Sequence, residues 1–331
     1  MNILGRIIGG VVVVSFLLTC LIGLLLLWQW QPMSSKTGST VQFVVYKGQS
    51  AVNISNRLEK DGIIRSKYLF RLWVKFYKLE SKLQAGSYKL DPGWTLAKII
   101  TTLTQGTDDY WITIPEGWRR QEIAESLMNQ ELPVFDKTEF LALTEDAEGK
   151  LFPDTYLIPK EITTKALVNL LLSTYDKKVV LGLEKQIQAF ELRTKKNFKE
   201  ALILASLVQR EARTPAQMKT VAGILWNRLE IGMPLQVDAT LQFAKGFDAT
   251  VSGWWGSPLA ADKELDSPYN TYLNPGLPPG AICNPGLAAI QAVLDPTETE
   301  ALYYLHDGDG LMYTANTLQE HNRNVNTYLR N

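Results

Sequence analysis

Histidine, cysteine and long runs of like charge are scarce in this chain of 331 residues, and each scarcity excludes a class of site. The only residues of the first two types are His306, His321, Cys20 and Cys283. These four lack the clustered spacing of a zinc site, so we expect no metal and no cofactor. We expect no disulfide either, because Cys20 lies in an apolar segment far from Cys283. No run of five like charges occurs, which argues against nucleic-acid binding.

The charges balance to zero over the whole chain, but they are unevenly distributed. Residues 36–105 carry 12 basic and 4 acidic residues, whereas residues 106–331 carry 21 basic and 30 acidic ones. This asymmetry predicts two modules with different surroundings. The basic module is suited to anionic lipid or an anionic polymer, although an ordinary solvated surface has the same composition.

The first long apolar run, residues 7–28, contains no charged residue. As a helix it would measure ~33 Å, against about 30 Å for the hydrocarbon core of a bilayer. A cleaved signal peptide is the alternative, but the run is long for one and no small-residue cleavage site follows. We therefore predict a cytoplasmic tail at 1–6, a transmembrane helix at 7–28 and a linker at 29–40. The large C-terminal part is then expected outside the cytoplasm.

A strand, a turn glycine and a helix follow one another three times, around Gly48, Gly93 and Gly117. Apolar residues alternate before each glycine and recur at i, i+4 after it. This layout, with an extra helix at 66–77, predicts a compact module over 41–106, and the third copy opens a second domain at 107–331. Chance recurrence of the same layout is the alternative.

Helical periodicity dominates the second domain up to residue 232, so we predict an α+β fold in which this domain is mainly helical. Helices are expected at 118–130, 137–144, 163–180 and 182–192. A further helix is capped by Asn197 and Glu200 and ends near Arg213, and the next begins at Thr214 and stops at Gly232. Short strands and a last helix at 318–329 are expected beyond residue 233.

Glu211 interrupts an apolar helix face, in line with the apolar residues three, four and seven positions earlier. Burial raises the pKa of a carboxyl group, and so does the negative end of a helix dipole. A carboxyl group that stays protonated near neutral pH suits a general acid acting on a glycosidic oxygen. Arg210 and Arg213 would oppose the shift if they turned inwards. The alternative is a boundary glutamate that reaches water or pairs with an arginine.

Hydrolysing glycosidases need a second carboxylate, for which Asp154 and Asp238 are the candidates. A Pro-Asp turn and a strand-edge cap are their respective structural explanations. Residues 267–286 combine tyrosines, asparagines and Asn-Pro-Gly turns, which suits a groove that hydrogen-bonds sugars or, alternatively, a surface loop. Trp254 and Trp255 could stack on sugar faces, although packing is the favoured interpretation.

Six motifs together carry a resemblance to a known family. The chain resembles the MltG/YceG-like endolytic murein transglycosylases over nearly all of its length, in the order of tail, membrane span, LysM-like module and catalytic domain. The motifs are EGKLFPDTY (148–156), ILASLVQREA (203–212), NRLEIGMPLQVDAT (227–240), SPYNTY (267–272), GLPPGAICNPG (276–286) and EHNRNV (320–325).

The resemblance implies a lyase of the bacterial cytoplasmic membrane that cleaves the β-1,4 bond between N-acetylmuramic acid and N-acetylglucosamine in nascent peptidoglycan strands. It leaves a 1,6-anhydro end and ends strand elongation, with peptidoglycan synthases as partners. The family's catalytic glutamate corresponds to Glu211, which acts first as acid and then as base. The residues corresponding to its substrate groove are Asp154, Thr155, Tyr156, Gln236, Asp238, Thr240, Tyr269, Asn270, Thr271 and Tyr272.

Two departures from the family pattern keep other functions open. Gln209 stands where the family commonly has an acid, and Met312 and Thr314 stand where it often has histidine and phenylalanine in Gly-x-His-x-Phe. The first alternative is a hydrolase of muramidase type, in which Asp238 or Asp154 activates water. The second is a non-catalytic, membrane-anchored scaffold that binds peptidoglycan.

Overall fold

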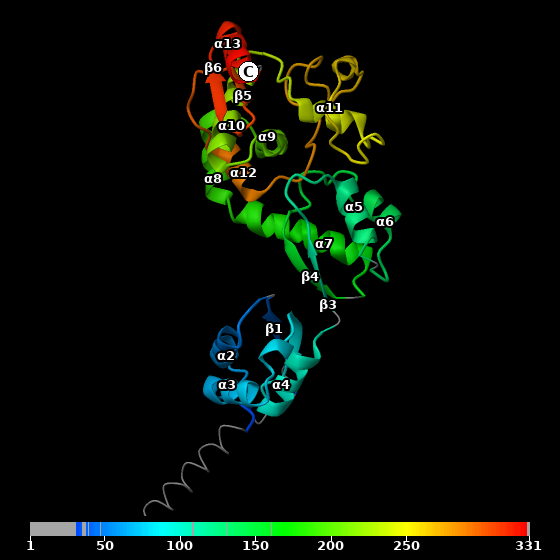
Figure 1. Ribbon diagram of the computed structural model, residues 1–331, viewed down its shortest axis with the longest axis vertical. Helices are drawn as coiled ribbons and strands as arrows, with labels where there is room; N and C mark the ends of the chain where they lie inside the picture. Colours follow the sequence, from blue (N-terminus) through cyan, green and yellow to red (C-terminus); the bar gives the residue numbers. More distant parts are fainter. Residues whose placement is uncertain are drawn as a thin grey trace, which may run out of the picture. The chain divides into compact units, whose positions relative to one another are not determined.

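The computed structural model describes residues 31–34, 38, 40–46, 48–107, 109–130, 132–159 and 161–329. These residues form two compact units (Figure 1). The first unit contains the described residues up to Trp111 together with 157–159, and the second contains Ile112–Tyr156 and the described residues from Glu161 onwards. The predicted tail and transmembrane helix and half of the linker lie outside the described residues. Within the described part of the chain, no helix is both long and apolar enough to span a bilayer.

The first unit is built on a pair of antiparallel strands covered by helices. Val41 lies opposite Leu90, and Val45 lies opposite Gly86. Its elements are β1 (Val41–Val45), α2 (Ala51–Lys60), α3 (Lys67–Phe76), η1 (Glu80–Lys82), β2 (Gly86–Leu90) and α4 (Leu96–Gln105). That this unit is LysM-like stays a prediction.

All three predicted strand–turn–helix copies are present: β1 with α2, β2 with α4, and β3 (Asp109–Thr113) with α5 (Arg120–Met128). The apolar positions that define the pattern are buried in each copy, for example Phe43, Tyr88 and Ile112. Gly48 and Gly117 adopt positive φ angles of 78° and 79°, which glycine tolerates best. The recurrence therefore reflects the same set of buried apolar positions in each strand and the helix that follows it.

The second unit is mainly helical, and α9 (Phe198–Glu211) lies at its centre, packed against α10 (Pro215–Glu230) and α12 (Leu287–Leu294). The chain enters this unit along β3 and leaves it along β4 (Thr155–Pro159), which pairs with β3. It returns to the unit at Glu161. Figure 1 shows the terminal hairpin beside α10 and the last helix next to that hairpin. The other elements are α6 (Lys137–Leu143), α7 (Thr164–Tyr175), η2 (Asp176–Leu181), α8 (Glu184–Thr194), α11 (Asp238–Lys245), η3 (Ala260–Glu264), β5 (Tyr303–His306), β6 (Met312–Ala315) and α13 (Leu318–Tyr328).

The predicted caps of α9 and α10 are confirmed. Asn197 and Glu200 form a reciprocal capping box, and Thr214 does the same with Gln217. α9 ends at Glu211, two residues before Arg213, because Ala212 is extended. Glu211 is therefore the last helical residue.

Two helices beyond residue 233, α11 and α12, were not predicted. Each has only eight residues and lies among glycine- and proline-rich segments that obscure helical periodicity. The interpretation of Asp238 as a strand-edge cap is wrong, because Asp238 is the first residue of α11.

Candidate active site

Glu211 lines a polar cavity of about 420 Å³ in the second unit. The cavity lies between the end of α9, the start of α11, strand β5 and helix α13. Its lining residues are Glu211, Arg228, Gln236, Asp238, Lys263, Tyr272, Tyr303, Tyr304, Leu305, Leu318, His321, Val325 and Leu329. Four residues that the sequence nominated, Glu211, Gln236, Asp238 and Tyr272, thus share one cavity.

The carboxyl group of Glu211 is held from β5. The hydroxyl of Tyr304 donates a hydrogen bond to Oε2 of Glu211, with 2.8 Å between the oxygens. The backbone of α9 fixes the other end of the side chain. The carboxyl group is therefore oriented while its side chain remains partly open to solvent.

Burial is the main cause that raises the pKa of Glu211, and the nearby carboxylate of Asp238 raises it further. The hydrogen bond from Tyr304 and the positive charges of Arg210 and Arg228 lower the pKa, but they do not cancel the effect of burial. The position at the C-terminal end of α9 adds unfavourable dipole charge for the anion. The protonated form of Glu211 is therefore more favoured in this site than that of a glutamic acid in water.

Asp238 faces the cavity from the first turn of α11, where the helix dipole favours an anion. The hydroxyl of Tyr272 donates to Oδ1 of Asp238 over 2.6 Å. The ammonium group of Lys263 lies 4.8 Å from the centre of the Tyr272 ring. Asp238 and Tyr272 thus form a hydrogen-bonded pair on the rim of the cavity.

Two predicted groove residues, Thr240 and Thr271, are buried and support this pair. Their hydroxyl oxygens lie 2.9 Å apart, and Thr271 Oγ1 accepts a hydrogen bond from the backbone of Val237. The two threonines join the segments that carry Asp238 and Tyr272. They position the site and do not face a ligand.

Gln236 lies two residues before Asp238 and has a positive φ of 51°. This conformation is uncommon for residues other than glycine. Its backbone N–H donates to the carbonyl of Thr271 over 3.1 Å. This hydrogen bond holds the strained turn, so Gln236 lines the cavity beside Asp238.

Asn270 is also buried and holds the segments that carry Lys263 and Tyr272. Its side-chain amide donates to the carbonyls of Lys263 and Leu265, and its Oδ1 accepts from the backbone of Tyr272. Tyr272 and Lys263 are thereby fixed relative to each other.

The other predicted groove residues do not line this cavity. On and next to β4, Asp154 pairs with Lys178, Thr155 contacts Thr113, and the Tyr156 hydroxyl donates to the carbonyl of Phe152.

Tyr269 packs against Phe243 and lines a different cavity, together with Glu148. The indole N–H groups of Trp254 and Trp255 donate to Glu125 and Glu122, respectively. The packing interpretation of the two tryptophans therefore agrees with their contacts.

Arg228 and Tyr304 belong to the cavity but were not singled out from the sequence. Arg228 donates from Nε to the carbonyl of Leu302 and from Nη1 to that of Leu235, both over 2.6 Å. It thereby ties the chain entering β5 to the segment that leads into α11. The sequence feature that could have indicated this role is an arginine on the buried face of α10.

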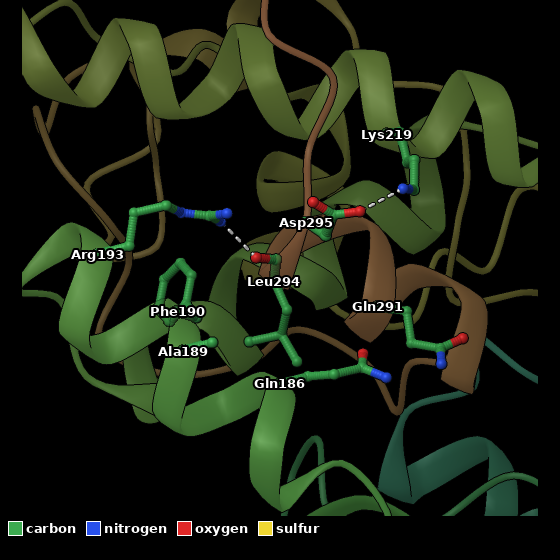
Figure 2. A pocket seen from close by; sticks show the side chains of 8 residues that line it. All are labelled: Gln186, Ala189, Phe190, Arg193, Lys219, Gln291, Leu294 and Asp295. Carbon is green, nitrogen blue, oxygen red and sulfur yellow. Dashed lines mark hydrogen bonds and ion pairs between the residues drawn. The ribbon is translucent and has the colours of Figure 1, made fainter.

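Another cavity, of about 470 Å³, lies between α8, α10 and α12 (Figure 2). Arg193 donates to the carbonyl of Leu294, and Asp295 pairs with Lys219 over 2.6 Å. Asp295 is the only carboxylate among the eight side chains drawn, and it is strongly exposed and neutralised. This cavity offers no protonated acid, so the Glu211 cavity is the better candidate.

A model of the YceG-like family matches residues 43–327. The chain belongs to the YceG-like family. It is 32% identical over 326 residues to a Bacillus subtilis protein named endolytic murein transglycosylase, covering 90% of this chain and 88% of that protein. A Streptococcus pneumoniae protein of the same name is 29% identical over 334 residues, and the match covers 89% of this chain and 59% of the longer relative.

The fold also matches a solved YceG-like structure. A crystal structure of a YceG-like protein from Listeria monocytogenes superimposes with a TM-score of 0.54 at 26% sequence identity. The superposition covers 86% of this chain and 99% of the other chain.

The two departures of this YceG-like chain from the family pattern have visible contacts. Oε1 of Gln209 accepts a hydrogen bond from the backbone N–H of Gly286 over 2.9 Å. A carboxylate oxygen could accept the same bond, so a neutral residue suffices for this role. Met312 lies directly opposite His306 in the β5–β6 hairpin and packs on the core.

Proposed function

We propose that this chain is an endolytic murein transglycosylase, a lyase that cuts bonds between N-acetylmuramic acid and N-acetylglucosamine within peptidoglycan strands. The observation that carries the proposal is a single acid, Glu211, whose pKa is raised and whose carboxyl group is oriented in a polar cavity. The names of the curated relatives support the same reaction. A neutral acid is what the leaving oxygen of a glycosidic bond requires.

In the first half of the reaction, Glu211 donates its proton to the glycosidic oxygen, and the bond from that oxygen to the anomeric carbon of muramic acid breaks. Positive charge develops on the sugar ring as the bond lengthens. The carboxylates of Glu211 and Asp238 face this charge and lower its energy. Tyr304 and Tyr272 hold these two groups in place by the hydrogen bonds described above.

In the second half, the 6-hydroxyl of muramic acid attacks the anomeric carbon. The carboxylate of Glu211 accepts the proton of that hydroxyl, so the acid is regenerated and no water is consumed. The products are a free 4-hydroxyl on N-acetylglucosamine and a 1,6-anhydro ring on muramic acid. The nucleophile belongs to the substrate, which removes the need for a second carboxylate.

A hydrolase of muramidase type is the second candidate, and the position of Asp238 beside Glu211 favours it over a hydrolase that uses Asp154. Asp238 lines the same cavity, whereas Asp154 is paired with Lys178 and does not. In that reaction Asp238 would activate a water molecule, and the product would carry a reducing end.

Mass spectrometry of the products separates the two reactions, because an anhydro end is lighter than a reducing end by one water. Full-length protein in detergent is incubated with uncrosslinked glycan strands, and Asp238→Asn is tested beside the wild type. We expect anhydro ends from both proteins, with slower cleavage by the variant. Reducing ends from the wild type, or complete loss of cleavage in Asp238→Asn, would contradict the transglycosylase assignment.

We further propose that residues 7–28 anchor the enzyme in the bacterial cytoplasmic membrane, with the 1–6 tail in the cytoplasm and the 41–106 module and 107–331 catalytic domain outside. This position would bring Glu211 to strands as they are polymerised, so cleavage would end elongation beside the synthases. The uncharged apolar run supports the anchor. Digestion of intact spheroplasts with protease tests it, because only external domains are then cut.

A further inference from the structure

One helix of the first unit has an apolar face that nothing in the described chain covers. Tyr68, Leu72 and Phe76 follow one another at intervals of four residues along α3 and are 68%, 61% and 76% exposed. Residues four apart lie on one face of a helix. Tyr77 is exposed next to Phe76 and contacts its ring edge-on. These four residues are called the α3 stripe.

The opposite face of α3 accounts for the fold of the helix without the stripe. Leu69, Phe70 and Val74 are buried in the core of the first unit. The stripe is therefore not needed to hold the helix in place. A row of large apolar side chains left in water points to a contact with something else.

Positive charge surrounds the stripe. Residues 65–82 contain six basic residues and one acidic residue. Lys67 and Arg71 lie over the ring of Tyr68, 5.4 and 5.8 Å from its centre. Lys75 and Lys78 are exposed beside Phe76. The face thus combines aromatic and aliphatic groups with lysine and arginine.

The linker from the predicted membrane span lies at the start of the same helix. Arg65, two residues before α3, donates from Nε to the carbonyl of Pro32 over 2.9 Å and from Nη2 to that of Met33 over 3.3 Å. Pro32 is only four positions beyond the end of the predicted span at residue 28. Even a fully extended chain reaches only ~14 Å over these four residue steps.

We propose that the α3 stripe docks on the surface of an anionic lipid bilayer. This inference rests on the proposed membrane anchor, which would bring the start of α3 within reach of the headgroups. Aromatic side chains are favoured at the membrane interface, and basic side chains beside them reach the anionic headgroups. Leu72 and Phe76 offer no hydrogen-bonding group to a sugar, which favours lipid over a glycan strand.

Fluorescence of full-length protein in vesicles tests the docking. Cys20→Ser removes one cysteine, and Cys283 is buried, so an added cysteine can be labelled with the environment-sensitive dye NBD. The label is placed at Leu72→Cys and, as a matched control, at Leu192→Cys, an exposed apolar position on α8. One set of vesicles contains phosphatidylcholine alone, and the other also contains phosphatidylglycerol.

We expect the emission at position 72 to shift to the blue in the anionic vesicles only, and the emission at position 192 to stay unchanged. Lys75→Gln with Lys78→Gln should lower the ratio of docked to undocked protein by about fivefold for each lysine. High salt should have a similar effect, because it screens the attraction. The thermal unfolding of the double variant should match that of the wild type, since both lysines are exposed.

Equal emission at position 72 in both kinds of vesicle would overturn the proposal. Failure of the protein to float with the vesicles in a density gradient would overturn it as well. A shift that needs added glycan strands would indicate glycan binding instead, and one that grows with protein concentration would indicate contact between copies. Cleavage of soluble strands is measured on the same samples. A protein that cleaves strands but shows no blue shift at position 72 would refute the docking alone. A protein that shows the shift but does not cleave strands would refute the proposed activity alone.

Discussion

Two glutamates in the second unit, Glu211 and Glu148, share a pKa raised by burial but differ in their neighbours. Burial raises the pKa of Glu148 from 4.5 to about 8. Its oxygens accept hydrogen bonds from the backbone of Arg120 over 3.2 Å and from the side-chain amide of Asn284 over 2.9 Å. Glu211 accepts a hydrogen bond from the hydroxyl of Tyr304, and each of the two glutamates lines a cavity of its own.

The partners of Glu148 show that it joins segments of the fold. Asn284 also donates to the carbonyl of Trp118 and accepts from the backbone of Leu151. Glu148 thus connects the start of α5 with two loops that are distant in sequence. Burial raises the pKa of both glutamates, but Glu148 accepts hydrogen bonds from the backbone of Arg120 and the amide of Asn284, whereas Glu211 accepts one from the Tyr304 hydroxyl. A raised pKa alone therefore does not identify a catalytic acid.

The comparison is tested most strongly by replacing each glutamate with glutamine. Glu211→Gln should lower cleavage of glycan strands by roughly 10²–10⁴-fold or more, because the amide cannot donate and recover the proton. Glu148→Gln should keep cleavage within a few-fold of the wild type. Rates are measured per folded molecule. Similar losses in both variants would show that the two sites do not differ in the way proposed.

Truncation of Glu148 should affect stability instead of chemistry. Glu148→Ala leaves the Asn284 amide and the Arg120 N–H without their acceptor in a buried place, at a cost of about 2–3 kcal/mol. Urea unfolding followed by fluorescence measures this change. A variant as stable as the wild type would mean that Glu148 does not hold these segments together.

The pH dependence of stability should follow from the same raised pKa. Between pH 4.5 and 8 the folded protein holds a proton on Glu148 that the unfolded chain has released, so the free energy of unfolding falls as pH rises through this range. Glu211 contributes in the same direction. Urea midpoints measured against pH should therefore decline less steeply in Glu148→Gln, and an unchanged slope would refute the assignment.

Removing the hydroxyl that holds Glu211 should have a smaller effect on activity. In Tyr304→Phe the carboxylate loses a hydrogen bond, so the pKa of Glu211 should rise and the high-pH limb of the rate profile should move to higher pH. We expect kcat to fall roughly 3–10-fold, with little change in KM, as the acid loses its orientation. Tyr303→Phe is the control, because its neighbouring ring lines the same cavity without this bond. An equal shift in both variants would exclude a specific role for Tyr304.

The smallest effect is expected at Gln209. Gln209→Ala removes the acceptor of the Gly286 N–H and should cost about 1 kcal/mol of stability. Gln209→Glu should restore most of it, because a carboxylate oxygen can accept the same bond. Thermal unfolding of the two variants provides the measurement, and a glutamate variant as unstable as the alanine variant would disprove this explanation.

Local patterns predicted much of the fold. The three strand–turn–helix copies and the caps at Asn197 and Thr214 depend on residues that are close in sequence, and all were found. Glu211 was located by its place on the apolar face of one helix. The short helices α11 and α12 were missed because their composition is that of loops.

The composition of the cavity could not be derived in the same way. Tyr304 lies 93 residues after Glu211, and no periodicity connects them. Thr240 and Thr271 were predicted to belong to a substrate groove, but both are buried and their hydroxyl groups are hydrogen-bonded to each other. Asp154 belongs to the motif EGKLFPDTY (148–156), yet it forms an ion pair with Lys178 and does not line the Glu211 cavity.

The two hydrogen bonds of Arg228 have a consequence for biosynthesis. They join the segment before α11 to Leu302, so the cavity closes only when the chain beyond that residue is present. A nascent polypeptide that already displays Glu211 still lacks Tyr304 and the last helix. Premature termination after α12 should therefore yield an inert product, because Tyr304 and the partners of Arg228 beyond α12 are then missing.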